Sequence, residues 1–132
     1  MDNSFKDLSG KSVTMQKQVA RNDTYDGLLS TAALTRYMLE TAWALLDSEL
    51  HEGVTSVAAM VQVTHEEPTV AGEIVTVEAT VKRVEKNRVS ISMKAVDETG
   101  VIAHGLNERL IVDKISLKHL ADQRAAALKN IL

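Results

Sequence analysis

The clearest feature of the chain is a change of hydrophobic period near residue 50. Residues 28–46, LLSTAALTRYMLETAWALL, have the apolar spacing of one helix, and from residue 57 onward apolar and polar residues alternate. The helical stretch is apolar around most of its circumference, which is typical of a helix that other elements cover. Its polar strip, about 40° wide at 100° per residue, consists of Arg36, Glu40 and Asp47. We therefore expect a central helix that packs on a sheet.

The alternating stretches predict the strands of that sheet. Residues 12–19 alternate weakly, and residues 57–65, 75–82 and 88–95 alternate clearly. A last strand is expected over residues 101–112. Reversals are expected at residues 86–87 and 97–100, and the single proline lies in the loop 66–72, EEPTVAG. One helix against an antiparallel sheet with a polar outer face is an α+β architecture. Residues 116–132 predict a terminal helix, and the polar residues 1–11 are expected to be frayed.

Composition narrows the class of protein without naming it. The 132 residues suit one domain spanning 1–132, and 45% hydrophobic with 25% charged residues is ordinary for a globular chain. A formal charge of −3 argues against nucleic-acid binding, and the lack of cysteine excludes disulfides and thiolate zinc sites. No apolar run reaches the roughly 18 residues of a membrane span, and the start does not have the apolar core of a secretory signal. We expect a soluble, cytoplasmic protein.

Two residues are candidates for chemistry, and each has an ordinary alternative. Glu40 is either a surface carboxylate near Arg36 or a partly desolvated base or nucleophile on an otherwise apolar helix. His65 ends an alternating strand before the proline loop, where side chains often face a cleft, but it is also consistent with an exposed loop histidine. Periodicity alone favours the ordinary reading of both.

The start of the helix offers hydroxyl groups. Ser30 or Thr31 is expected to cap the helix, and the free N–H groups of its first turn suit a developing oxyanion. The four histidines have no HxxxH or HExxH spacing, so no metal site is predicted. The motifs GxSxG, GxxxxGK[ST] and GxGxxG are absent, and we expect no cofactor.

Three segments of the sequence match a known family. They are LSTAALTRYMLETAW on the helix, VTHEEPTVAGEIVTV after the second strand, and HGLNERLIVDK on the last strand. With the strands between them they cover roughly residues 28–114. The chain resembles the hot-dog-fold acyl-CoA thioesterases, in particular the fluoroacetyl-CoA thioesterase-like branch. The middle segment is the most specific, because a glycine follows the histidine of VTH by seven residues after a proline-containing loop.

The resemblance implies a fold, an assembly and a set of site residues. A central helix is wrapped by an antiparallel sheet of about five strands, and two sheets join edge to edge in a homodimer, alone or within a tetramer. The active sites then lie between subunits, with the helix residues from one chain and the histidine from its partner. The catalytic residues implied are Glu40, His65 and Thr31. The residues expected to contact the acyl-CoA substrate are Tyr25, Ser30, Ala32, Ala58 and Arg109.

The chain also departs from the branch at three positions. The family threonine usually precedes the glutamate by eight residues, where this chain has Ala32, and Thr31 is nine residues back. Ala58 replaces a glycine of the fluoroacetyl enzymes, and Asn107 replaces the histidine of GTHER. We therefore expect hydrolysis of a small or medium acyl-CoA other than fluoroacetyl-CoA. The alternatives are a catalytically silent acyl-CoA-binding dimer and, ranked last, a hydratase or dehydratase.

Overall fold

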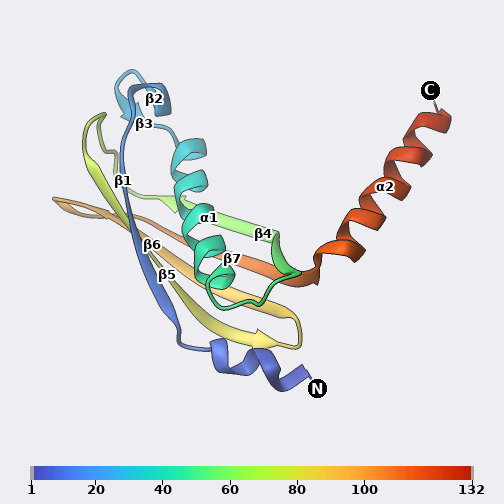
Figure 1. Cartoon of the computed structure of the whole chain (residues 1–132). Coiled ribbons are helices and arrows are strands. Elements are labelled where there is room, and N and C mark those ends of the chain that lie inside the picture. Colours follow the sequence, from blue (N-terminus) through green and yellow to red (C-terminus); the bar gives the residue numbers. More distant parts are fainter. Residues whose placement is uncertain (1, 132) are drawn as a thin grey trace.

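The computed structural model describes the backbone of residues 2–131 and the side chains of residues 5–131. A five-stranded antiparallel sheet, in the order β1-β5-β6-β7-β4, curves behind one central helix, α1 (Figure 1). This is the α+β arrangement predicted from the hydrophobic pattern. The elements are η1 (Asp2–Leu8), β1 (Ser12–Gln18), η2 (Arg21–Asp23), β2 (Thr24–Tyr25), β3 (Leu28–Leu29), α1 (Thr31–Asp47), β4 (Val54–His65), β5 (Ile74–Glu85), β6 (Arg88–Asp97), β7 (Gly100–Asp113) and α2 (Lys114–Ile131).

The helix α1 begins where its cap was predicted. The Ser30 hydroxyl accepts a hydrogen bond of 3.0 Å from the Ala33 amide, which satisfies one of the free N–H groups of the first turn. The side of α1 that faces the sheet is buried and mostly apolar, and it contacts all five strands, β5 most of all. Its buried residues are Ala33, Leu34, Tyr37, Met38, Thr41, Ala42, Leu45 and Leu46.

Another side of α1 is uncovered, which differs from the expectation that other elements enclose it. The indole of Trp43 is 44% exposed, and Leu39 is only partly buried. These residues face the side of α1 toward β4, the edge strand, whose own outer edge has no neighbour within the described chain. Apolar residues on this side of the helix predicted that it is buried. They do not show which element, or which other chain, buries it.

The strands and turns follow the predicted alternation closely. The reversals lie at Lys86–Asn87 and Glu98–Thr99, as expected. Lys86 has a φ of +58°, a left-handed conformation that a tight turn imposes. The pairing of β4 with β7 shifts register between Ala58 and Met60, so a β-bulge interrupts the edge strand halfway along.

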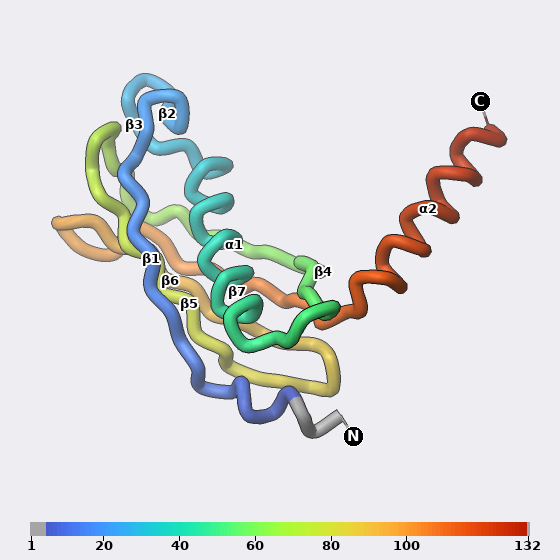
Figure 2. The backbone as a smooth tube through the Cα atoms, in the orientation of Figure 1, coloured from blue at the N-terminus to red at the C-terminus, as the bar shows by residue number. Residues whose placement is uncertain are grey.

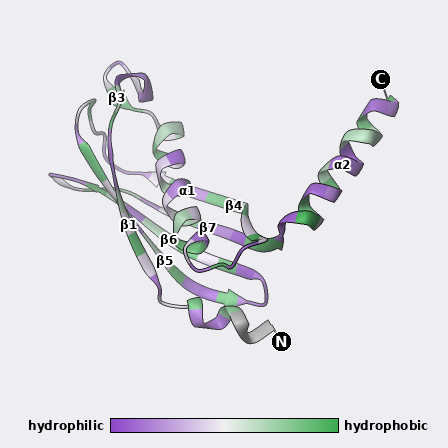
Figure 3. Ribbon diagram, viewed as in Figure 1, coloured by the Kyte–Doolittle hydropathy of each residue, from purple (hydrophilic) through white to green (hydrophobic). Residues whose placement is uncertain are grey.

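The two ends of the chain differ from each other. Residues 2–8, expected to be frayed, form η1, and Leu8 is buried at 6% exposure against the core. The terminal helix α2 instead leaves the sheet after β7 and extends away from it (Figure 2). No residue of α2 with a described side chain is buried, and green and purple alternate along it in Figure 3. Within residues 2–131 no helix is both long and apolar enough to cross a membrane.

Gly105 in β7 lies where β4 and side chains of β6 and α1 leave no room for a Cβ atom. A Cβ atom added there would lie 2.9 Å from the Gln62 carbonyl oxygen and 3.0 and 3.2 Å from the terminal methyls of Met93 and Met38. Gly105→Ala is therefore expected to destabilise the fold by about 1–3 kcal/mol, since the backbone oxygen cannot move aside as a side chain can. Urea unfolding measures this loss, and an unchanged midpoint would contradict the close approach.

Asp23 ties the segment before the helix to α1. Its carboxylate accepts hydrogen bonds of 2.6 Å from the Tyr37 hydroxyl and 2.7 Å from Arg36. These donors lower the pKa of Asp23, with the Tyr37 bond as the largest cause. Burial, followed by the bond to Asp23, raises the pKa of Tyr37 to about 12. The cluster fixes the connection that delivers the chain to the start of α1.

The raised pKa of Tyr37 gives a pH dependence of stability. Because the folded pKa exceeds the unfolded value of about 10, the neutral phenol contributes its full stabilisation below pH 10. That contribution is lost as the pH rises from about 10 toward 12. Urea midpoints of the wild type should therefore fall more steeply over this range than those of Tyr37→Phe. Parallel curves for the two proteins would show that Tyr37 does not titrate as described.

Candidate active site

The first residue of α1 and the last residue of β4 are in contact. Thr31 Oγ1 lies 2.9 Å from His65 Nδ1, within one chain. The backbone brings them together, because the Leu29 amide donates to the carbonyl of Thr69 in the loop that follows β4. The expectation that all the helix residues and the histidine come from different subunits is therefore wrong for this pair.

The second nitrogen of His65 has no described partner. Nε2 is buried and makes no hydrogen bond in the described chain. If Thr31 donates its hydroxyl proton to Nδ1, the neutral ring carries its own proton on Nε2. A buried N–H without an acceptor is costly, so a ligand oxygen placed there would be favourable. The pair thus provides one donor ready for a substrate atom.

A separate groove runs beside α1. It has a volume of about 480 Å³ and is largely apolar, and its residues come from α1, β4 and β7: Ala32, Thr35, Arg36, Leu39, Glu40, Trp43, Ala58 and Arg109. We call it the α1 groove. The groove runs along the uncovered side of α1, from Ala32 to Trp43. A smaller pocket of about 260 Å³ holds His65 with Leu28, Leu29, Glu66, Glu67 and Pro68.

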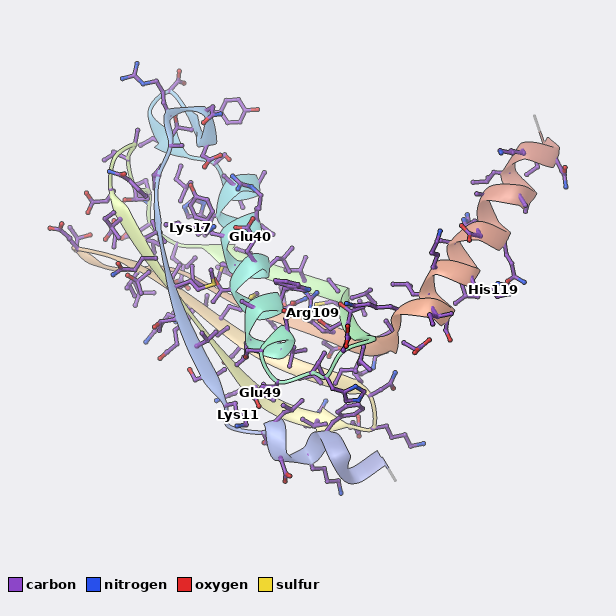
Figure 4. All side chains as sticks on the ribbon, viewed as in Figure 1. Lys11, Lys17, Glu40, Glu49, Arg109 and His119 are labelled. Carbon is purple, nitrogen blue, oxygen red and sulfur yellow. The ribbon has the colours of Figure 1, made fainter. Side chains whose placement is uncertain are left out.

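Glu40 lies on the rim of the α1 groove and is paired with cations. Its Oε1 atom is 2.9 Å from Lys17 Nζ on β1, and its Oε2 atom is 4.0 Å from Arg36 (Figure 4). The Lys17 contact is an ion pair by distance, although its angles do not meet those of a hydrogen bond. The side chain as a whole is 43% exposed. The carboxyl group of Glu40 thus lies beside an apolar groove, with its Oε1 atom buried and the side chain as a whole partly exposed.

The structure does not bring Glu40 and His65 together within one chain. The two residues line different pockets. Thr31, which contacts His65, is separated from Glu40 by about 13 Å along the helix axis and by half a turn around it. The nine-residue spacing noted in the sequence therefore has a structural consequence: Thr31 and Glu40 cannot act on one atom from the same helix.

Arg109 is buried beneath the α1 groove. It is 5% exposed, and its guanidinium donates to the Ser56 hydroxyl at 2.9 Å, the Ser56 carbonyl at 3.2 Å and the Asn107 side-chain oxygen at 3.0 Å. Asn107, fully buried, also donates to the Met60 carbonyl at the β-bulge at 2.8 Å. Burial lowers the pKa of Arg109. Ser56 was not among the site residues predicted from the sequence, although it accepts two of the three hydrogen bonds of Arg109.

The other predicted site residues are divided between the helix start and the surface. Ser30 caps α1, and Ala32 and Ala58 line the α1 groove. Tyr25 lies in β2, is 80% exposed, and lines neither of these two pockets. Among the described residues, no three histidine, aspartate or glutamate side chains form a cluster that could hold a metal ion.

Comparison with known proteins identifies the family. The model of the fluoroacetyl-CoA-specific thioesterase family matches residues 12–115. A hot-dog-like protein from Thermanaerovibrio acidaminovorans is 38% identical, with 91% of this chain and 96% of that chain covered and a TM-score of 0.86. A hypothetical protein of Thermus thermophilus, a thioesterase superfamily member, is 21% identical over 92% of this chain and 96% of its own, with a TM-score of 0.88.

A third similar structure contains a ligand. It is a variant of the fluoroacetyl-CoA thioesterase FlK in complex with acetyl-CoA, 22% identical over 88% of this chain and 97% of its own, with a TM-score of 0.83. No curated protein matches the chain. The matched residues 12–115 contain Thr31, His65 and all the residues that line the α1 groove. The match confirms the fold and the thioesterase activity that the three sequence segments implied. The chain therefore belongs to the fluoroacetyl-CoA-specific thioesterase family, and it is a hot-dog-fold acyl-CoA thioesterase.

Proposed function

We propose that the enzyme hydrolyses the thioester of a small or medium acyl group to a carboxylate and free CoA. The observation that carries this proposal is the Thr31–His65 contact, which presents a buried imidazole nitrogen without a partner at the start of a helix. The acetyl-CoA bound to the FlK variant supports a CoA thioester as ligand. Residues 1–132 would act as a single domain.

We further propose that the working unit is a homodimer joined along β4. This strand presents an open edge of 12 residues, a template for pairing with another strand. Val61 on β4 and Trp43 on α1 are 40% and 44% exposed, and a second copy on this edge would reduce the exposure of such apolar side chains. A second copy on this edge would cover the α1 groove and place its own α1 opposite.

In this dimer the catalytic groups would come from two chains. Thr31 and His65 of one subunit would meet Glu40 of the other. As water attacks the carbonyl carbon, the Glu40 carboxylate takes one of its protons, or Glu40 itself attacks and water later releases the acyl group. His65 Nε2–H donates to the carbonyl oxygen, and the N–H groups at the start of α1 stabilise the same developing charge. The C–S bond then breaks, and the CoA thiolate takes up the proton that Glu40 removed from water, or a proton from solvent where Glu40 itself attacks.

A CoA-release assay tests the proposal. Wild-type enzyme is incubated with straight-chain acyl-CoAs from acetyl to decanoyl, and free thiol is measured, with Glu40→Ala as the control. Turnover that depends on Glu40 and is confined to small and medium chains is expected. Tight binding of acyl-CoA without turnover by the wild type would instead select a silent binding protein.

A further inference from the structure

Lys17 occupies a position on β1 where the alternation of the strand predicts an apolar residue. Val13 and Met15 before it and Val19 after it share its face, and the side chain of Lys17 is only 32% exposed. This face is turned toward α1, which contacts β1. A charged group placed there loses part of its water, a cost that an apolar residue avoids. Proteins commonly break such a local rule at functional sites.

The ammonium group of Lys17 meets one oxygen of the Glu40 carboxylate. Lys17 Nζ lies 2.9 Å from Oε1, and the two side chains approach each other from β1 and α1 in Figure 4. Oε1 is buried and has no hydrogen bond among the described residues, so Lys17 is the charged group that compensates it. A partly buried ion pair is often no more stabilising than apolar residues of the same volume. Stability alone therefore does not account for a lysine at this position.

The second oxygen of the Glu40 carboxylate is in a different environment. Oε2 is not buried, and the cation described closest to it is the Arg36 guanidinium at 4.0 Å. That guanidinium is itself 2.7 Å from the Asp23 carboxylate. Glu40 lines the α1 groove, and no ion pair among the described residues joins it to Arg109, the other cation there. One oxygen of Glu40 is thus held by a lysine, and the other is open to a ligand.

We propose that Lys17 is a positioning residue for thioester hydrolysis. It anchors Oε1 of Glu40, so that Oε2 is the oxygen that takes the proton from water or attacks the thioester. This inference rests on the proposed function and deepens it. Without the lysine no described group holds the buried oxygen, and the side chain, 43% exposed, would turn toward solvent. Because a displacement of about 1 Å costs a reaction about 10²-fold, the chemical step depends on Lys17 although Lys17 touches no reacting atom.

Lys17→Met tests the proposal, since methionine has nearly the length of lysine and suits an inward strand position. The substrate is the best of the straight-chain series from acetyl-CoA to decanoyl-CoA. We expect kcat to fall about 10- to 100-fold and KM to stay within about twofold. Lys17→Arg keeps a cation beside Oε1 and should restore kcat to within about fivefold of the wild type. A kcat of Lys17→Met within about threefold of the wild type would overturn the proposal.

Lys11→Met is the matched control. Lys11 lies just before β1 and pairs with Glu49 at 3.4 Å. Its loss should leave kcat and KM within about twofold of the wild type, because an exposed pair contributes little. Urea midpoints of both methionine variants show whether either is less stable. If Lys17→Met has the lower midpoint, Lys17→Gln repeats the test with a polar side chain, and the same criteria apply to it.

A double-mutant cycle shows whether the effect passes through Glu40. In a Glu40→Gln background, Lys17→Met should lower kcat further by less than about twofold, because the carboxylate that it positions no longer reacts. A loss as large as in the wild-type background would overturn the proposal, since Lys17 would then act on the fold or on another group.

A thioester without phosphates excludes the usual role of a lysine beside a CoA site, which is to bind a phosphate. The N-acetylcysteamine thioester of the same acyl group has the reacting bond and no phosphate. Lys17→Met should lose the same factor, about 10- to 100-fold in kcat, on this substrate as on the acyl-CoA. A loss confined to the acyl-CoA, or seen only in KM, would assign Lys17 to phosphate binding and overturn the proposal.

The proposed function and this inference fail on different results. If the wild type hydrolyses acyl-CoA and Glu40→Gln does not, a fully active Lys17→Met overturns the role of Lys17 alone. If no acyl-CoA is hydrolysed, the proposed function fails and the inference fails with it. If Glu40→Gln is as active as the wild type, hydrolysis stands, but Glu40 and Lys17 both leave the mechanism.

Discussion

His65→Ala is expected to lower kcat/KM for acyl-CoA hydrolysis by about 10²- to 10⁴-fold. The imidazole has one nitrogen in contact with Thr31 and a second, buried nitrogen without a partner among the described residues. Alanine removes the donor to the thioester carbonyl oxygen. The loss should appear mainly in kcat, since the imidazole acts on the reacting atoms and not on the CoA moiety. Thiol release under single-turnover conditions separates the rate of the chemical step from the binding of the acyl-CoA.

His104→Ala is the matched control for this variant. His104 also lies near one end of the sheet, but its side chain is 58% exposed and pairs with Glu66 at 3.0 Å. The change should leave hydrolysis within about twofold of the wild type, because an exposed pair of this kind contributes little. If His65→Ala retains more than a third of the wild-type kcat, His65 is not the donor.

Glu40→Gln is expected to lower kcat by about 10³-fold, because the amide can neither take a proton from water nor attack the thioester. Folding should change little, since the side chain is 43% exposed and glutamine has the size of glutamate and can place an oxygen at the buried Oε1 position 2.9 Å from Lys17. Glu49→Gln is the control, because Glu49 likewise pairs with a lysine, Lys11, at 3.4 Å. A Glu40→Gln variant that hydrolyses acyl-CoA at the wild-type rate would remove Glu40 from the mechanism.

The fold was predictable because most of its signals are local. The cap at Ser30, the alternation of residues 88–95 and the turn at Lys86–Asn87 depend on neighbours a few residues away, and all three are present. The uncovered side of α1 was not predictable, because an apolar side chain such as Trp43 has the same pattern whether its own chain or a second copy covers it.

The site was predictable only in its residue types. The three matching segments named Thr31 and His65, but their contact depends on how the loop after β4 pairs with residues 28–29, a tertiary relation. The ion pair of Glu40 with Lys17 joins residues 23 positions apart on different elements, and periodicity cannot report it. The same holds for Ser56, whose hydroxyl is recognisable as functional only once Arg109 is seen to donate to it.

A subunit-mixing experiment tests the shared site most directly. Glu40→Gln and His65→Ala are each expected to be nearly inactive alone. The two variants are co-expressed with different tags so that the mixed dimer can be isolated. Each mixed dimer would contain one wild-type site, with Thr31 and His65 from one chain and Glu40 from the other. The second site would carry both substitutions. If the catalytic groups come from two chains, the isolated mixed dimer should recover about half of the wild-type activity. A mixed dimer as inactive as its parents would show that Glu40 and His65 do not act across the subunit interface.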